Sequence, residues 1–250
     1  MDIPVYRGCD HSIIPPNFEH RHFHGLDGFG DVANLPYVTK VQHPNKIDFI
    51  LVGPLTNFAV CINMYGKQFL DKVRNIYIMG GNYRGKGNVT KSAEFNFRLD
   101  PEAAHIVFES FTKPMMVVPW ETCIDGDMNY DADWRFEVLS KVDSKVMHLM
   151  NTVENSLLRP LGYAKWIICD AVLVAAFLFP ELIITRSRLY HATVELTGQH
   201  TRGQMVLDHK RMDAGNACVI MSVHTDNYRQ IVAWTAGLLG DEGMEKILCD

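Results

Sequence analysis

The sequence feature that most constrains the fold is the stretch from Asn75 to Ser110. Asn75–Met79 is a short apolar run rich in strand-forming residues, and Gly80-Gly81 ends it. Asp100 can cap a following helix that opens with Pro101, because proline fits the first helical turn. The stretch therefore predicts a strand, a tight turn, a polar segment and a capped helix.

Between the predicted strand and helix lies a group of hydrogen-bonding side chains: Asn82, Asn88, Glu94, Asn96 and Asp100. They follow the carboxyl end of a strand, where open α/β sheets place ligands. Because Glu94 and Asn96 flank Phe95, an extended backbone would point both to one side. A carboxylate beside carboxamides suits a polyhydroxylated ligand such as a sugar. A polar loop with helix caps explains the same residues, and both interpretations stay open.

Other apolar runs alternate with helical patterns along the chain. Ile47–Val52 and Pro114–Val118 read as strands buried on both faces. Helical spacing of apolar residues is present in Leu55–Ile62 and Val138–Leu158. This alternation indicates an α/β fold with a largely parallel sheet, and we predict a single domain over residues 1–250.

Composition describes an ordinary soluble protein, with 47% apolar and 21% charged residues. A net charge of -5 gives no reason to expect nucleic acid or an anionic membrane as a partner. No apolar stretch approaches the roughly 20 residues that span a bilayer, and the N-terminus does not resemble a secretory signal. The six cysteines are scattered without CxxC spacing. Reduced thiols and a cytoplasmic location are therefore expected.

Three further positions each allow a functional and a structural interpretation. His20, His22 and His24 suggest zinc, but no second cluster completes a site, so a cleft-lining role for His24 is favoured. Thr56 follows Gly53-Pro54 at the end of a predicted strand, where a turn either contacts a ligand or starts a helix. Asp170 precedes an apolar helix, as an N-cap or as a carboxylate that binds a cation or a hydroxyl.

Five segments in this order resemble the inosine-uridine preferring nucleoside hydrolase family: HGLDGFGD, ILVGPLTNFA, IMGGNYRGKGNVTKSAEFNFRLDPEAAHIVF, CDAVLVAAFLFPEL and VELTGQHTRGQMVLD. The resemblance extends from about Ile3 to Val223, and the AEFN…DPEAA stretch is its most specific part. It implies an open, mostly parallel sheet flanked by helices. It also implies an enzyme that cleaves the N-glycosidic bond of purine or pyrimidine ribonucleosides with water, giving ribose and a free base.

The resemblance implies a calcium ion that binds the ribose hydroxyls and the attacking water. Asp170 would bind calcium and ribose, and Thr56 would give calcium its backbone carbonyl. The residues implied to surround the ribose are Met79, Asn88, Glu94, Phe95 and Asn96. His24 would lie near the nucleobase as a catalytic residue. Family members are usually homodimers or homotetramers, so the same is expected here.

The sequence also departs from the family pattern. The family's DxDxxxDD motif, which supplies the general base and most calcium ligands, is absent, as if the first βαβ unit were missing. Cys169 stands before Asp170, where many members have histidine as the proposed leaving-group acid. Thr56 and Asp170 alone fall short of the about 6–8 oxygen ligands of calcium. Impaired hydrolysis is therefore expected, and the alternatives are a non-catalytic nucleoside- or ribose-binding protein and a non-functional truncated isoform.

Overall fold

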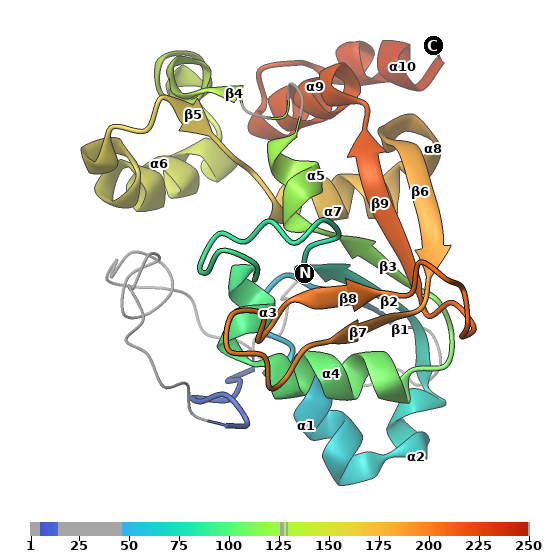
Figure 1. The fold of residues 1–250 in the computed structure, drawn as a ribbon. Helices are drawn as coiled ribbons and strands as arrows, with labels where there is room; N and C mark the ends of the chain where they lie inside the picture. Colours follow the sequence, from blue (N-terminus) through green and yellow to red (C-terminus); the bar gives the residue numbers. More distant parts are fainter. Residues whose placement is uncertain (1–5, 15–46, 126–127, 129, 250) are drawn as a thin grey trace.

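The computed structural model describes residues 6–14, 47–125, 128 and 130–249. In this part of the chain a central sheet has the strand order β1-β2-β3-β9-β6 (Figure 1). These strands are β1 (Ile47–Leu51), β2 (Val73–Met79), β3 (Met115–Val118), β9 (Ala217–Val223) and β6 (Ile184–Tyr190). The pairs from β1 to β9 are parallel and β6 is antiparallel, which confirms the predicted α/β fold with a mostly parallel sheet.

Helices cover the sheet, and two small ribbons flank it (Figure 1). The helices are α1 (Thr56–Tyr65), α2 (Lys67–Leu70), α3 (Phe95–Leu99), α4 (Pro101–Ser110), α5 (Trp120–Ile124), α6 (Lys145–Leu157), α7 (Asp170–Leu178), α8 (Pro180–Ile183), α9 (Thr225–Ala236) and α10 (Asp241–Cys249). The ribbons pair β4 (Tyr130–Asp131) with β5 (Lys165–Trp166), and β7 (Ala192–Val194) with β8 (Met205–Leu207). Among the described helices, none is long and apolar enough to cross a membrane.

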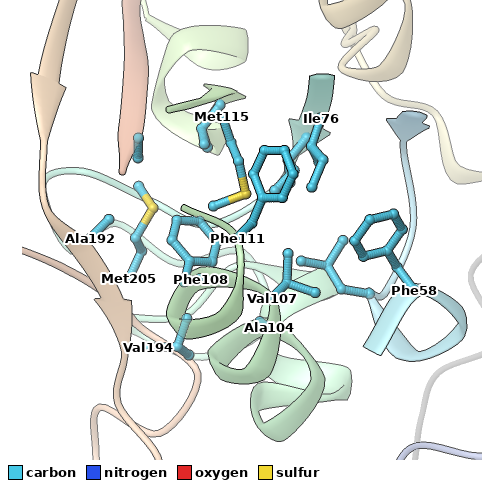
Figure 2. Packing of buried hydrophobic residues seen from close by; sticks show 14 of the residues in the cluster. Phe58, Ile76, Ala104, Val107, Phe108, Phe111, Met115, Ala192, Val194 and Met205 are labelled. Atoms are coloured by element: carbon cyan, nitrogen blue, oxygen red, sulfur yellow. The ribbon is translucent and has the colours of Figure 1, made fainter. Parts of the chain in front are cut away.

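Successive residues of the inner strands enter two different cores. In β3, Met115 and Val117 pack with α1, α4 and the β7–β8 ribbon, and Figure 2 shows Met115 in this first core beside Phe108 and Phe111. Met116 and Val118 face the second core, which α7 and α9 share. Since side chains alternate along a strand, both faces of the sheet are buried under helices. Because both faces are covered, a site can form only at the ends of the strands, where polar residues follow.

The prediction that Ile47–Val52 is buried on both faces was wrong. β1 is an edge strand of the sheet in the described part of the chain, and Ile50 and Val52 are 36% and 40% exposed. The apolar run resembles a central strand because β-branched and aromatic residues favour strands in either place. Sequence alone did not separate an edge strand from a central one.

The helix predicted over Val138–Leu158 was also partly wrong. A π-helical turn (Trp134–Val138) and a 3-10 turn (Leu139–Lys141) come first, and α6 begins only at Lys145. Ser144 caps α6, since its hydroxyl accepts a hydrogen bond from the amide of Met147 at 3.2 Å. The apolar residues keep helical spacing across this break, so their periodicity predicted one continuous helix.

Candidate functional site

The site is built where the parallel strands end. Gly80 and Gly81 follow β2, and the amide of Gly80 donates to the carbonyl of Val118 at the end of β3. Gly81 has φ +69, and a Cβ there would lie 2.8 Å from the ring of Phe97. Only glycine tolerates both this backbone conformation and this close approach. The turn therefore brings the polar segment back over the carboxyl end of β2.

Glu94 is the central carboxylate of this polar segment. Its side chain is 2% exposed. Its Oε2 accepts hydrogen bonds from the amides of Gly81 at 2.9 Å and Phe97 at 3.2 Å, and its Oε1 accepts one from Asn96 at 3.0 Å. A carboxylate offers about four acceptor positions, so Glu94 keeps capacity for a ligand hydroxyl.

These bonds overturn the expectation that Glu94 and Asn96 lie in extended chain. Glu94 itself is extended, but it caps the short helix α3, which begins at Phe95. Glutamate is not among the usual N-cap residues, so the pattern gave no sign of this helix. Asp100 behaves as predicted, since its Oδ1 accepts a hydrogen bond from the Ala103 amide and caps α4.

Burial raises the pKa of Glu94 to about 7, because a charged carboxylate is poorly solvated inside the protein. The hydrogen bonds from Asn96, Gly81 and Phe97 act in the opposite direction, and the negative charge of Asp170 raises the pKa further. Asp170 is therefore close enough to Glu94 for their charges to interact. The protonation of Glu94 therefore depends on the charge of Asp170, the second carboxylate of the predicted site.

Asn96 ties the carboxyl ends of two strands together. It is 7% exposed, and its Nδ2 donates to the carbonyl of Met79 at 3.1 Å and to that of Val52 at 3.4 Å. With the amide nitrogen used in this way, the carbonyl oxygen Oδ1 is the group that Asn96 can offer to a ligand hydroxyl. Met79 is buried beside it, so the structure brings Met79, Glu94 and Asn96 together.

Asp170 is the first residue of α7, and its side chain is exposed. The N-cap is Cys169, without a side-chain cap bond, so the interpretation of Asp170 as the N-cap was wrong. Its carboxylate lies in the first turn, where the positive end of the helix dipole favours negative charge. This is the position predicted for a carboxylate that binds a cation or a hydroxyl.

The remaining predicted residues lie in different settings. Thr56 is buried at the start of α1, and its hydroxyl donates to Asp100 Oδ2 at 2.6 Å. Phe95 is half-buried and Asn88 is exposed. The amide of Asn88 donates to the carbonyl of Ala93 at 3.2 Å, which closes the loop between them. His24, with its neighbours His20 and His22, lies outside the described residues.

Sequence reasoning missed the side chains that hold the polar loop. Glu121 is fully buried and accepts hydrogen bonds from the amides of Tyr83, Arg84 and Lys86. Asn82, also fully buried, accepts one from the Met205 amide at 3.1 Å. The sequence predicted Asn82 among the possible ligand residues, but its side-chain amide is hydrogen-bonded within the protein. A buried carboxylate just after β3 carries no local sequence signal.

A pair of thiols was missed as well. The pKa of the Cys123 thiol is raised well above its ordinary value, first by a hydrogen bond with Cys169 and then by burial. The two cysteines meet because α5 and α7 both contribute to the second core. Cys123 is therefore a neutral thiol at neutral pH, hydrogen-bonded to Cys169, and not an ionised nucleophile.

The described residues do not form a calcium site by themselves. Within the described ranges, no group of three or more His, Cys, Asp or Glu side chains could hold a metal ion. Calcium takes about 6–8 oxygen ligands. The Thr56 carbonyl and the Asp170 carboxylate would supply only part of such a set.

Fold and site together define an α/β protein with buried polar side chains gathered at the carboxyl ends of parallel strands. The family model described as inosine-uridine preferring nucleoside hydrolase matches residues 1–230. The chain belongs to this family of nucleoside hydrolases, which confirms the resemblance seen in its motifs.

Known relatives agree with this assignment. The chain is 28% identical over 229 residues to an inosine-uridine preferring nucleoside hydrolase of Crithidia fasciculata, covering 82% of this chain and 69% of that protein. It is 27% identical over 248 residues to a non-specific ribonucleoside hydrolase of Salmonella newport (strain SL254), covering 93% and 78%.

Solved structures share the fold. An inosine-guanosine nucleoside hydrolase superposes with a TM-score of 0.76 at 26% identity, covering 91% of this chain and 79% of that one. A plant nucleoside hydrolase gives a TM-score of 0.73 at 22% identity, which speaks for the fold alone.

Proposed function

We propose that this chain binds the ribose of a ribonucleoside at Glu94 and Asn96 and hydrolyses its N-glycosidic bond. The observation that carries the proposal is the carboxylate of Glu94, buried at the end of β2 and within electrostatic reach of Asp170. A buried carboxylate with spare acceptor capacity beside a carboxamide suits a sugar that presents neighbouring hydroxyls. Family membership supports the same substrate class.

In this proposal the oxygen of water bonds to the anomeric carbon of the ribose, and the bonding electrons of the N-glycosidic bond leave with the base. The proton that water loses balances the proton that the departing base takes up. Positive charge develops on the sugar as that bond breaks. The charge of Asp170, and the charge of Glu94 when it is ionised, stabilise it, because an opposite charge held nearby lowers the energy of the developing cation. Asn96 Oδ1 and Glu94 fix the sugar hydroxyls, and Phe95, Met79 and Asn88 border it.

Three further assignments rest on the family alone. Thr56 and Asp170 are proposed as two of several calcium ligands, and calcium when bound would hold ribose hydroxyls and water. His24 is proposed to lie near the nucleobase. A homodimeric or homotetrameric assembly in the cytoplasm is proposed on the same basis. No residue of the described part is assigned as the base that activates water.

The test is release of free ribose from inosine and from uridine, with calcium present. The wild-type protein is expected to release ribose, and Glu94→Gln is expected to lose at least about tenfold in rate, since one charged hydrogen bond is worth about 1.5–3 kcal/mol. Glu181→Gln is the matched control, because Glu181 is exposed on α8. Absence of ribose from folded, calcium-loaded protein would contradict hydrolysis.

A second candidate function is ribonucleoside binding without turnover. The observation that favours it is that, among the described residues, no cluster of three or more His, Cys, Asp or Glu side chains could hold a metal ion. Isothermal titration calorimetry with a nucleoside, combined with the assay of ribose release, separates the two candidates. Nucleoside binding without ribose release would support the second, and release would support the first.

A further inference from the structure

Two thiols that the proposed hydrolysis does not use meet between α5 and α7 (Figure 1). Cys123 lies on α5 and is 1% exposed, and Cys169 is the half-buried N-cap residue of α7. A hydrogen bond joins the two thiols, and both side chains pack in the second core. Since a disulfide needs an S–S distance of about 2.0 Å, two hydrogen-bonded sulfur atoms can form one after a limited movement.

The elements that carry the thiols are held in place by hydrogen bonds. The Thr122 hydroxyl donates to the carbonyl of Ile220 at 2.6 Å, which ties α5 to β9. The Tyr228 hydroxyl donates to the carbonyl of Ile168 at 3.2 Å, which fixes the backbone next to Cys169. The two sulfur atoms are therefore kept next to each other, and reacting groups held together in this way combine far faster than separate molecules.

The two cysteines differ in their access to solvent. Cys169 is half-buried, so a small oxidant reaches its sulfur first, whereas Cys123 is closed off inside the second core. A sulfenic acid that forms on an accessible cysteine condenses with a neighbouring thiol to give a disulfide. Cys169 therefore has the setting of the cysteine that is oxidised first, and Cys123 has that of its resolving partner.

Both elements also hold groups of the proposed ribose site. On α5, Glu121 precedes Cys123 by two residues and accepts hydrogen bonds from backbone amides of the polar loop after β2. On α7, Asp170 directly follows Cys169. A disulfide draws the two sulfur atoms closer than a hydrogen bond does, so its formation shifts the start of α7 relative to α5. The position of Asp170 therefore depends on the redox state of the two thiols.

We propose that Cys123 and Cys169 form a reversible disulfide that weakens ligand binding at the proposed ribose site. The oxidant is hydrogen peroxide. The Cys169 sulfur attacks one peroxide oxygen and becomes a sulfenic acid, the O–O bond breaks, and the other oxygen leaves with the thiol proton as water. The Cys123 sulfur then attacks the sulfenic sulfur, the S–O bond breaks, and hydroxide departs with the Cys123 proton as water. The two thiols are oxidised, and one peroxide is reduced to two water molecules.

A bond of this kind is reversible, because an external thiol reduces it by thiol–disulfide exchange. In a reducing compartment, disulfides are usually transient and redox-sensing rather than structural. Formation of the disulfide does not depend on nucleoside hydrolysis, whereas its effect on binding rests on the proposed function.

The experiment treats the full chain with hydrogen peroxide and maps its disulfides by tryptic digestion and mass spectrometry. Trypsin cleaves after Lys and Arg but not before Pro, so Cys123 is released in residues 99–135 and Cys169 in residues 166–186, each as the one cysteine of its peptide. The expected product is these two peptides joined, with two hydrogen atoms fewer than their sum. The denatured protein should lose two of its six thiols, and dithiothreitol should restore them.

Three variants test the assignment of the two residues. Cys169→Ser is expected to abolish the link between the two peptides, because Cys123 then has no thiol beside it. Cys123→Ala removes the other thiol and decides the question if Cys169→Ser does not give a cooperative melt. Cys218→Ser is the matched control, since Cys218 is likewise half-buried but lies on β9, and it should form the link as the wild type does.

Calorimetric titration of uridine tests the consequence for binding. Oxidised wild-type protein is expected to bind uridine at least about threefold more weakly than reduced protein, the loss expected when one hydrogen bond to a sugar hydroxyl is weakened. Dithiothreitol should restore the affinity. Cys169→Ser should bind uridine equally before and after peroxide treatment, which separates the disulfide from oxidation of methionine.

Three results overturn the proposal. The first is the absence of the link between the two peptides. The second is a link between Cys9 and Cys61 alone, whose thiols also lie close enough for their charges to interact. The third is equal uridine affinity of oxidised and reduced wild-type protein. Reduced protein that binds no uridine contradicts the proposed function instead, and the peptide map still decides whether the disulfide forms.

Discussion

Glu94 accepts a hydrogen bond from the backbone amide of Gly81 at 2.9 Å, and this bond joins the end of β2 to the start of α3. The same carboxylate also caps α3 through the amides of Asn96 and Phe97. The residue proposed to hold ribose therefore also holds the loop that forms the site. Tests of function at Glu94 need stability measurements beside them.

Replacing Glu94 by glutamine is expected to destabilise the fold. The amide NH₂ group cannot accept hydrogen bonds, so at least one of the backbone donors loses its acceptor inside the protein. Leaving such a buried donor unsatisfied costs about 1–3 kcal/mol. Urea denaturation at pH 8 measures the loss. Glu181→Gln should stay within about 0.5 kcal/mol of wild type, and an unchanged Glu94→Gln variant would show that the cap is unimportant.

Stability should also depend on pH through Glu94. Its pKa in the folded protein is raised from 4.5 to about 7, so the folded state holds this proton more strongly than the unfolded state. The resulting stabilisation is complete below pH 4.5 and is lost as pH rises through about 7, a difference of at most about 3 kcal/mol. The measurement is the free energy of unfolding from pH 5 to 8. The wild-type protein should exceed Glu94→Gln in free energy of unfolding by less at high pH than at low pH. An excess that stays constant from pH 5 to 8 would contradict the raised pKa of Glu94.

A buried ion pair should support the β4–β5 region. Arg135 is fully buried, and its Nε lies 2.6 Å from Glu154 Oε2. Glu154→Ala would leave the guanidinium charge buried without this partner, which typically costs about 3–5 kcal/mol. Glu137→Ala removes an exposed carboxylate that pairs with Lys141, and should cost no more than about 1 kcal/mol. Equal melting temperatures of the two variants would disprove the difference.

Calcium binding should depend on Asp170. The melting temperature of wild-type protein is expected to rise with added calcium, because a ligand that binds only the folded state stabilises it. Asp170→Asn should abolish most of this rise. Asp226→Asn is the matched control, since Asp226 is likewise an exposed acid in the first turn of a helix. A calcium response that is the same in both variants would exclude Asp170 as a ligand.

Local sequence patterns predicted several elements correctly. β2, the Gly80-Gly81 turn and α4 follow from strand propensity, glycine and an Asp-Pro helix start, all of which act within a few residues. The ordered motifs also identified the family. These features depend on short-range chemistry, which a sequence displays directly.

Other features depend on contacts that are distant in sequence. The contact of Cys123 with Cys169 requires the packing of α5 against α7, and the hydrogen bond from the Ser92 hydroxyl to the carbonyl of His200 requires the β7–β8 turn to reach the loop before α3. Burial distinguishes Glu94, inside the site, from Asn88, on the surface, although both belong to one polar segment. No local pattern encodes that difference.

The central claim is that Asn96 and Glu94 form a ribose-binding site, and calorimetric titration of uridine tests it most directly. Wild-type protein and Asn75→Ala, an asparagine at the opposite end of β2, are expected to bind uridine equally. Asn96→Ala is expected to bind at least about tenfold more weakly, because the carboxamide oxygen is lost. Uridine binding that is the same in Asn96→Ala and wild type, or absent in wild type, would contradict the claim.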